Sequence, residues 1–228
     1  MISFSSEQAS FDPTGNKVWL SSRLMPLLLR RRVQRDAFSL PGIIELGAGT
    51  GLCGIAAAHL GFPSVILTDR EPSILKLLRE NAALNAVQGR SVSVKCVSWE
   101  HDGSPDPQSS APELVISCDC LYAPEAPLLL CHSAMAQGRP ASDGGHCFLL
   151  MNAQNRLLMD SADSCVVDSA KIAGYEHIGT FDPKLLCECE PKILEKAAEM
   201  GVRLFAFSCG KRGHKEAKIF ESVLLNDG

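Results

Sequence analysis

Hydrophobic and polar residues are arranged along the chain in two recurring ways. Short runs of apolar and β-branched residues are typical of buried strands, and longer stretches whose apolar positions recur every three or four residues are typical of amphipathic helices. The short runs predict strands at residues 43–46, 64–68, 91–97, 114–118, 146–152, 175–181 and 202–208. The longer stretches predict helices at residues 18–33, 52–60, 71–85, 124–137, 157–173 and 191–200. Because strands and helices alternate, the pattern predicts an α/β fold with a mostly parallel, doubly wound sheet of seven strands.

Three parts of the chain depart from this regular alternation. Pro26 lies inside the first predicted helix, and a proline there would kink or split the helix. The last two strands follow a different rhythm, so we expect one of them to run antiparallel to its neighbours. The opening residues 1–11 could add a short strand or hairpin, and the tail, residues 209–228, could be helix or strand.

No internal repeat and no linker divides the sequence. The stretch 101–112 is rich in Gly, Pro, Ser and Asp and reads as a loop. We therefore expect one domain over residues 1–228, with an N-terminal segment and helix (1–40), an α/β core (41–208) and a tail (209–228).

Composition narrows the class of protein. Hydrophobic residues make up 46% of the 228 residues and charged residues 21%, which is ordinary for a globular domain. The net charge of −4 provides no basic field, so we expect no nucleic-acid partner. The chain lacks an apolar stretch of the roughly 18 residues that a membrane helix needs, and it starts without the features of a signal peptide. We expect an intracellular monomer, cytoplasmic with the nucleus left open, that contacts no membrane.

The ten cysteines fit a reduced protein better than a secreted disulfide framework. Most of them sit in apolar runs, where cysteine behaves as a small core residue. Cys118-x-Cys120 and Cys187-x-Cys189 lack the longer spacer of zinc sites, and the six histidines show no ligand spacing. We therefore expect no metal.

One stretch carries most of the chemistry. Residues 43–54 read Ile-Ile-Glu-Leu-Gly-Ala-Gly-Thr-Gly-Leu-Cys-Gly, an apolar strand entering a glycine-rich turn before a helix. Glycine permits positive φ angles and close approach of a ligand to the backbone. At the carboxyl end of a parallel strand, this arrangement is typical of a nucleotide-like cofactor site.

Two cofactors fit that turn. Gly49-x-Gly51-x-x-Gly54 matches the dinucleotide fingerprint, with an acid about 20 residues further on. Glu45-x-Gly47-x-Gly49-x-Gly51 matches the loop that binds S-adenosylmethionine. The second interpretation is favoured, because a dinucleotide strand would need an apolar residue where Glu45 stands. S-adenosylmethionine also carries an ammonium and a sulfonium, which suit an acid at the end of the first strand.

Further candidate residues follow the next strands. Asp69 ends the second strand, where a carboxylate can accept both ribose hydroxyls or cap the following helix. Trp99 follows the third strand and could stack on a purine or cover the core. Asp119 and Tyr122 follow the fourth strand; an acid and an aromatic there could orient a cationic side chain, or form a packed turn.

Together these residues resemble the seven-β-strand protein methyltransferases, in the branch of the lysine methyltransferase 21-like and calmodulin-lysine methyltransferase enzymes. The resemblance covers roughly residues 14–208. It rests on Thr14-Gly15 with Trp19, the run Glu45 to Gly51, Thr68-Asp69, Glu80-Asn81 with Asn85, Ser98-Trp99, and Asp119 with Tyr122. Residues 140–145 and 184–190 depart from the family pattern, and such edge segments help to select a substrate.

The resemblance implies the class I S-adenosylmethionine-dependent fold, described as Rossmann-like, and a role for each matching residue. The cofactor-contacting residues would be Trp19, Glu45, Gly47, Gly49, Gly51, Asp69, Trp99 and Asp119. Asp119 and Tyr122 would shape the channel for the target side chain. Residues 152–156 follow the fifth strand, where the family also places substrate-side residues.

The implied reaction is methyl transfer to a protein side chain, with a lysine ε-amine as the leading acceptor. Histidine, arginine or small-molecule acceptors stay open. The alternatives of other classes are a nicotinamide-dependent oxidoreductase and a non-catalytic, partner-binding member of the fold. The identity of the substrate protein does not follow from the motifs.

Overall fold

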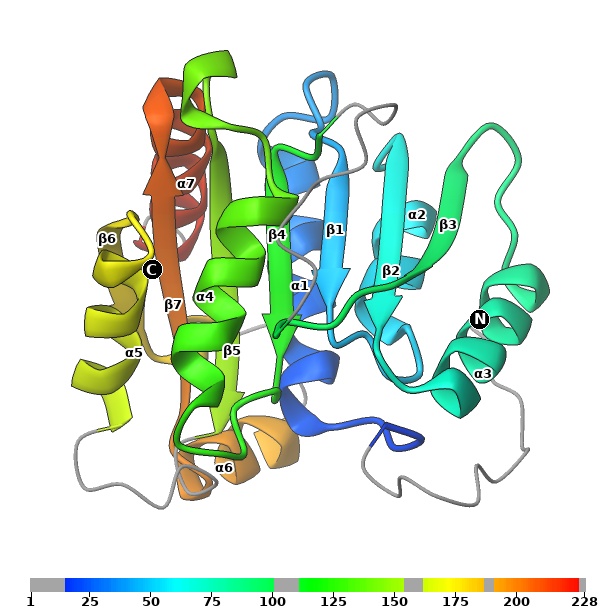
Figure 1. Ribbon diagram of the computed structural model, residues 1–228, viewed down its shortest axis with the longest axis horizontal. Coiled ribbons are helices and arrows are strands. Elements are labelled where there is room, and N and C mark those ends of the chain that lie inside the picture. The colour runs from blue at the N-terminus through cyan, green and yellow to red at the C-terminus, as the bar shows by residue number, and fades with distance from the viewer. Residues whose placement is uncertain (1–14, 101–110, 154–161, 187–190, 226–228) are drawn as a thin grey trace.

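A single mixed sheet organises the molecule (Figure 1). The computed structural model describes residues 15–100, 111–153, 162–186 and 191–225. The sheet has seven strands in the order β3-β2-β1-β4-β5-β7-β6. Strands β3, β2, β1, β4 and β5 run parallel to one another. Strand β7 is antiparallel to both β5 and β6. The predicted fold class and the predicted antiparallel strand are therefore confirmed.

The elements alternate as the hydrophobic pattern predicts. The strands are β1 Ile43–Leu46, β2 Ser64–Asp69, β3 Ser91–Cys96, β4 Leu114–Cys118, β5 His146–Ala153, β6 Glu176–Phe181 and β7 Val202–Cys209. The helices are α1 Leu20–Arg35, α2 Leu52–Leu60, α3 Pro72–Leu84, α4 Ala126–Gln137, α5 Ala162–Ile172, α6 Pro191–Glu199 and α7 Gly210–Leu225, with short 3-10 turns η1 Ala141–Asp143 and η3 Pro183–Leu185. Residues 210–225 of the tail form a helix, which settles for them the choice left open by the sequence. The predicted opening strand at residues 1–11 lies outside the described residues.

Helix α1 passes through Pro26 as one element, so the predicted split does not occur. A proline cannot donate to the carbonyl four residues earlier, which here belongs to Ser22. The thiol of Cys53 in α2 points at that oxygen, with Sγ 3.5 Å from it. A donor from the neighbouring helix thus compensates for the missing backbone bond.

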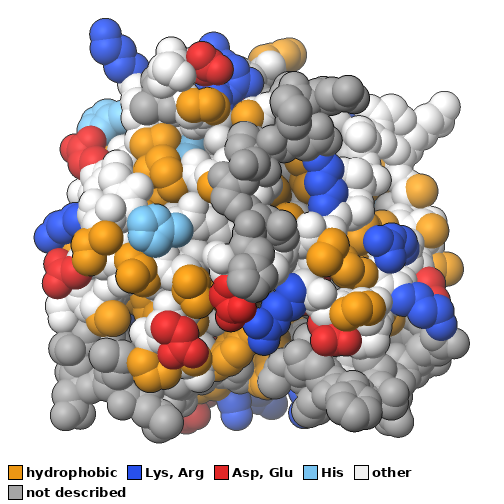
Figure 2. Space-filling view, in the orientation of Figure 1, with side chains coloured by type: hydrophobic (Ala, Val, Ile, Leu, Met, Phe, Trp, Pro, Cys, Tyr) orange, Lys and Arg blue, Asp and Glu red, His pale blue; other side chains and the backbone are white. Residues whose placement is uncertain are grey.

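Helices cover both faces of the sheet (Figure 1). One face packs against α1, α2 and α7, through a core that includes Leu28, Phe62 and Phe220. The other face packs against α4 and α5, around Leu130 and Phe148. On the face that carries α4 and α5, apolar and charged side chains are interspersed (Figure 2). Within the described residues no helix is long and apolar enough to cross a membrane.

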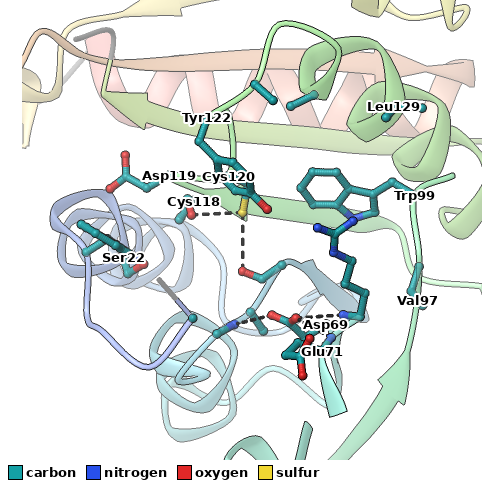
Figure 3. A pocket seen from close by; sticks show the side chains of 18 of the residues that line it. Ser22, Asp69, Glu71, Val97, Trp99, Cys118, Asp119, Cys120, Tyr122 and Leu129 are labelled. Atoms are coloured by element: carbon teal, nitrogen blue, oxygen red, sulfur yellow. Dashed lines mark hydrogen bonds between the residues drawn. The ribbon is translucent and has the colours of Figure 1, made fainter. Parts of the chain in front are cut away.

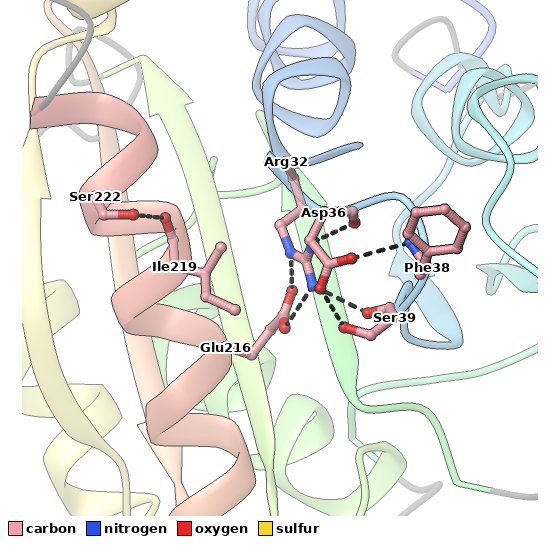
Figure 4. A network of polar contacts seen from close by, with 7 residues as sticks. All are labelled: Arg32, Asp36, Phe38, Ser39, Glu216, Ile219 and Ser222. Atoms are coloured by element: carbon pink, nitrogen blue, oxygen red, sulfur yellow. Dashed lines mark hydrogen bonds and ion pairs between the residues drawn. The ribbon is translucent and has the colours of Figure 1, made fainter. Parts of the chain in front are cut away.

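A buried ion pair joins the first helix to the last one (Figure 4). The side chain of Arg32 in α1 is fully buried, and its Nε lies 2.7 Å from Oε1 of Glu216 in α7. The same guanidinium donates to the carbonyls of Asp36 and Ser39, at 2.8 and 3.0 Å. Arg32, near the end of α1, is therefore part of the interior.

Candidate functional site

A pocket of about 240 Å³ opens at the carboxyl edge of the parallel strands (Figure 3). Its walls come from the segment before α1, the glycine turn after β1, and the ends of β2, β3 and β4. The lining residues include Gly15, Lys17, Trp19, Ser22, Gly47, Gly49, Asp69, Arg70, Glu71, Trp99, Glu100, Cys118, Asp119, Cys120, Tyr122, Glu125 and Leu129. Parallel strands end at one edge, which is why side chains distant in sequence meet there.

The glycine turn needs glycine for two separate reasons. Gly47, Gly49 and Gly51 have φ angles of 67°, 54° and 82°, in the left-handed region that other residues rarely adopt. A Cβ on Gly47 would also lie 2.6 Å from the Sγ of Cys120, and one on Gly49 would lie 2.9 Å from the carbonyl oxygen of Gly15. Gly47 and Gly49 line the pocket, whereas Gly51 lies behind it, against Leu78.

Glu45 does not line the pocket, contrary to the expectation from its sequence position. Its side chain turns under the glycine loop, where Oε2 accepts a hydrogen bond of 2.8 Å from the amide of Gly54. Burial raises the pKa of Glu45 to about 7, with the Gly54 amide opposing the shift. The carboxyl group therefore occupies the start of α2 rather than facing a ligand.

Asp69 and Trp99 form one wall of the pocket (Figure 3). Strand β2 pairs with β3 so that Asp69 is opposite Cys96, which brings the residues after β3 beside Asp69. The Asp69 carboxylate accepts hydrogen bonds from the amides of Gly49, Arg70 and Glu71, at 3.2, 2.8 and 3.2 Å. The N-cap residue of α3 is Glu71, so Asp69 holds the turn before the helix instead of capping it.

The start of α1 forms a second wall. Trp19 is the N-cap residue of α1 and lines the pocket together with Gly15 and Ser22. Both tryptophans of the chain, Trp19 and Trp99, are half-buried against this pocket. From the sequence alone, core packing would be the preferred interpretation of Trp19, whereas the structure places this residue at the pocket, as the family resemblance implies.

Asp119 lies where β4 ends, with both carboxylate oxygens engaged by the backbone. Oδ2 accepts a hydrogen bond of 2.9 Å from the amide of Ser21, and Oδ1 accepts one of 2.9 Å from the amide of Ala153. Asp119 is 5% exposed. The sequence left this carboxylate either a cationic side chain to orient or a place in a packed turn; the structure shows that it lines the pocket and also holds two other segments of the chain.

Tyr122 stands at the mouth of the pocket and is 58% exposed. The loop that carries it is held by Asn152, whose Oδ1 accepts a 3.1 Å hydrogen bond from the amide of Leu121. Asn152 and Ala153 are the described part of the predicted substrate-side stretch 152–156, and the Asn152 side chain contacts the backbone of this loop. Two residues complete this wall: Glu125, the N-cap residue of α4, and Leu129 within α4. Sequence reasoning missed both, although α4 starts at the same sheet edge as Tyr122.

The pocket is lined by more acidic than basic side chains. Asp69, Glu71, Glu100, Asp119 and Glu125 are acidic, and Lys17 and Arg70 are basic. Arg70 is partly neutralised by Glu100, at 3.8 Å. Such a lining favours a ligand that carries positive charge.

The cysteines near the pocket are closely packed thiols. Cys53 and Cys118 approach to 3.7 Å between sulfur atoms, and Cys120 contacts the carbonyl of Gly47 at 3.5 Å. Burial raises the pKa of Cys118 and of Cys120, so both stay protonated at neutral pH. In the described part of the chain, no three His, Cys, Asp or Glu side chains are grouped so as to hold a metal. Cys187 and Cys189 lie outside it.

Comparison with known proteins gives a consistent result. Residues 3–137 match the sequence model of a family described as lysine methyltransferase. Protein N-lysine methyltransferase METTL21A of Danio rerio is 44% identical over 91 residues, which are 39% of this chain and 40% of the zebrafish protein. EEF1A lysine methyltransferase 3 of Mus musculus is 39% identical over 89 residues, which are 39% of this chain and 37% of the mouse protein. These matches thus span about 40% of the length of the relatives.

Solved structures share the fold across the whole sheet. Magnesium protoporphyrin IX methyltransferase of Synechocystis PCC 6803 with bound SAM superposes with a TM-score of 0.60 at 14% identity, covering 90% of this chain and 87% of that protein. This likeness identifies the fold as that of the class I S-adenosylmethionine-dependent methyltransferases.

Proposed function

Because the chain belongs to the lysine methyltransferase family, whose methyl donor is S-adenosylmethionine, we propose that it transfers a methyl group to the ε-amine of a lysine in a protein. The observation that carries this proposal is the acid-lined pocket at the sheet edge, where Gly47 and Gly49 adjoin Asp69. Residues 3–137, the stretch that the family model matches, include each of these three residues.

The residues present suit S-adenosylmethionine. The Asp69 carboxylate accepts three backbone amides, two of them on Oδ1 and one on Oδ2, so Oδ2 can also accept a ribose hydroxyl. Trp99 presents an indole on the same wall, where it can stack on the adenine. Gly47 and Gly49 leave the room that a Cβ would fill, and Trp19 lines the pocket from the residue before α1.

The start of α2 argues against a nicotinamide dinucleotide. In a dinucleotide site the pyrophosphate rests on the first amides of the helix that follows the glycine turn. Here the amide of Gly54 already donates to the Glu45 carboxyl group, which is 2% exposed. A second anion at that helix end would lack the amide and would be repelled by ionised Glu45.

When bound, S-adenosylmethionine would supply a sulfonium methyl group: a neutral amine nitrogen would attack the methyl carbon in line, the carbon–sulfur bond would break, and S-adenosylhomocysteine would leave. A free lysine has a pKa near 10.4 and must lose a proton before it can attack. Tyr122 can hold the lysine side chain against its ring at the pocket mouth, and the acidic lining attracts its positive charge. Partial burial next to Cys118 and Cys120 favours the neutral amine, and holding it in line with the methyl supplies the rate by proximity. We assign no general base.

The first test is titration of the protein with S-adenosylmethionine and S-adenosylhomocysteine, with NADH and NADPH as controls. Binding is measured by the quenching of tryptophan fluorescence. Both tryptophans line the pocket, so the signal reports on this site. We expect micromolar binding of the adenosyl ligands. Asp69→Asn should weaken it at least about tenfold, because a charged hydrogen-bond acceptor is lost. Asp168→Ala, an exposed carboxylate on α5, is the matched control and should change nothing. Binding of only the nicotinamides would refute the proposal.

The second test identifies the acceptor. The protein is incubated with methyl-labelled S-adenosylmethionine and a cell extract, and the labelled proteins are hydrolysed to amino acids. Label in methyl-lysine supports the proposal. Label in methyl-histidine, methyl-arginine or a small molecule would show that this group, and not lysine, is the acceptor. Cofactor binding without methyl transfer would favour a non-catalytic role. An intracellular location stays a prediction.

A further inference from the structure

Asp119 joins three parts of the chain that are far apart in sequence. Its two carboxylate oxygens accept hydrogen bonds from the amide of Ser21 in the first turn of α1 and from the amide of Ala153 at the end of β5. These partners lie 98 and 34 residues away. The carboxylate is 5% exposed, so both bonds are formed away from bulk water.

The start of α1 depends on this carboxylate. The first amides of a helix have no partner within the helix, and a side chain at the N-cap position normally accepts one of them. Trp19 is the N-cap residue of α1, and it makes no such bond. The Ser21 amide is bonded by Asp119 instead, and a negative charge at a helix N-terminus is favourable. Asp119 therefore caps α1 from another element.

The backbone of Asp119 is unusual as well. Its φ of 53° is the only positive value among the non-glycine residues that the structure describes. Aspartate tolerates this left-handed conformation better than most residues do. The turn sends the chain back over the glycine loop, where Cys120 contacts Gly47 and the next residues lead to Tyr122.

We propose that Asp119 is a positioning residue that fixes the wall carrying Trp19 and the loop carrying Tyr122 relative to each other, without touching the reacting amine. The effect of Asp119 on catalysis rests on the proposed function, whereas its positioning of the two segments does not. One carboxylate thereby couples the cover of the cofactor pocket to the mouth that admits the acceptor. Loss of either hydrogen bond should be felt on both sides of the pocket.

A double-mutant cycle between Asp119→Asn and Ser21→Pro tests the coupling. Asn keeps the shape of Asp but offers one acceptor oxygen and an NH₂ group that cannot accept an amide proton. Pro at Ser21 removes the amide without breaking an intrahelical bond, because the first helical turn tolerates proline. Ser21→Ala is the matched control, since the buried Ser21 hydroxyl has no hydrogen-bond partner and the amide is retained.

The primary readout is the emission of Trp19 in a Trp99→Phe background, measured without any ligand. We expect Asp119→Asn and Ser21→Pro to shift the Trp19 emission in the same direction, with the double variant shifted by less than the sum. Ser21→Ala and Asn152→Ala, which leaves the Asp119–Ser21 bond intact, should keep the wild-type emission. An unshifted spectrum in Asp119→Asn would overturn the proposal even if Ser21→Pro failed to fold. This readout needs neither cofactor nor turnover, so it is independent of the proposed function.

The secondary readout separates positioning from contact with the amine. A positioning role predicts that Asp119→Asn weakens S-adenosylhomocysteine binding about tenfold or more, as expected for loss of a hydrogen bond to a charged group. A direct role on the amine predicts a lower kcat at saturating cofactor with unchanged cofactor affinity. A lower kcat with unchanged cofactor affinity in Asp119→Asn, together with unchanged Trp19 emission and cofactor affinity in Ser21→Pro, would refute the assignment.

Discussion

The part of the sheet formed by β1 to β4 and the part formed by β5, β7 and β6 use their side chains differently. Around the pocket, small residues and carboxyl groups hold the backbone, as when Asp69 accepts three amides beside the glycine turn. Around β5 and β7, large rings fill the interior, with Phe148, Tyr175 and Phe207 at centroid distances of 5.6 to 6.1 Å. The family match ends at residue 137, just before this second part.

The difference shows that a binding site and the support for it need different contacts. A ligand that lies along the backbone requires absent side chains, and the resulting turn is then stabilised by hydrogen bonds to its amides. Around β5 and β7 the described residues instead bury aromatic area, which contributes much to stability. The buried His146 of this part is paired internally: it bonds the hydroxyl of Tyr175 at 2.6 Å and the carbonyl of Arg139 at 2.8 Å.

The largest expected effect comes from the ion pair that links the two halves. Arg32→Met leaves Glu216 with a nearly buried, unpaired charge, since that side chain is 12% exposed. We expect the free energy of unfolding to fall by about 3–5 kcal/mol, as measured by urea denaturation. The double variant Arg32→Met with Glu216→Leu should recover much of the loss, because an apolar pair replaces the ion pair. A single variant as stable as the wild type would show that the halves are not joined here.

A smaller effect on stability and a specific effect on binding are expected at the glycine turn. Gly49→Ala forces a non-glycine residue to a φ of 54° and places a methyl group 2.9 Å from the Gly15 carbonyl oxygen. The left-handed conformation costs about 1–2 kcal/mol, and we expect S-adenosylhomocysteine affinity to fall at least about tenfold because Gly15 must move.

Gly89→Ala is the matched control for that substitution. Gly89 has a φ of 76°, yet a Cβ there would meet nothing within 4 Å. Gly89→Ala should lower the stability in thermal denaturation by a similar amount and leave the cofactor affinity unchanged. Equal loss of affinity in both variants would mean that backbone strain, and not the contact with Gly15, is responsible.

The last expected effect is a pH dependence of opposite sign in the two halves. Burial raises the pKa of Glu45 from 4.5 to about 7, so the folded protein binds the proton more tightly and this contribution to stability is lost as pH rises from 4.5 to 7. Burial lowers the pKa of His146 below 6.5, so the unfolded chain is protonated first and stability is lost as pH falls below 6.5. Each slope is at most about 1.4 kcal/mol per pH unit.

Urea denaturation between pH 5 and 8 measures both slopes. Relative to the wild type, Glu45→Gln should become progressively more stable as pH rises to 7, because Gln still accepts the Gly54 amide without a charge. The loss of stability in His146→Gln, relative to the wild type, should be smallest at low pH, where the buried histidine itself destabilises the wild-type protein. A stability difference between Glu45→Gln and the wild type that does not change with pH would contradict the burial of an ionisable group at Glu45.

Several features of the fold were predictable from the sequence. The seven strands begin and end within a residue of their predicted limits, because period-two and continuous apolar runs are a property of adjacent residues. Gly47 and Gly49 reach positive φ as the turn chemistry requires. The clustering of Asp69, Trp99 and Tyr122 at one edge followed from the rule that parallel strands end together.

Other features depended on contacts that no local pattern encodes. Glu45 was expected at the pocket, but the approach of α2 to β1 offers the Gly54 amide, and the carboxyl group turns toward it. Helix α1 continues past Pro26, and the Ser22 carbonyl that the proline leaves without its backbone donor lies beside Cys53 of another helix. In each case the deciding partner belongs to a different element, and its position depends on how the elements pack.

The sequence by itself determined the order of strands and helices, the glycine turn and the set of polar residues at the sheet edge, because these follow from neighbouring residues and from chain direction. Only the tertiary structure decided what each buried carboxyl group binds. A buried carboxylate must find donors wherever packing supplies them, and for Asp119 those donors are the amides of Ser21 and Ala153, brought together by the closing of α1 and β5 around the end of β4.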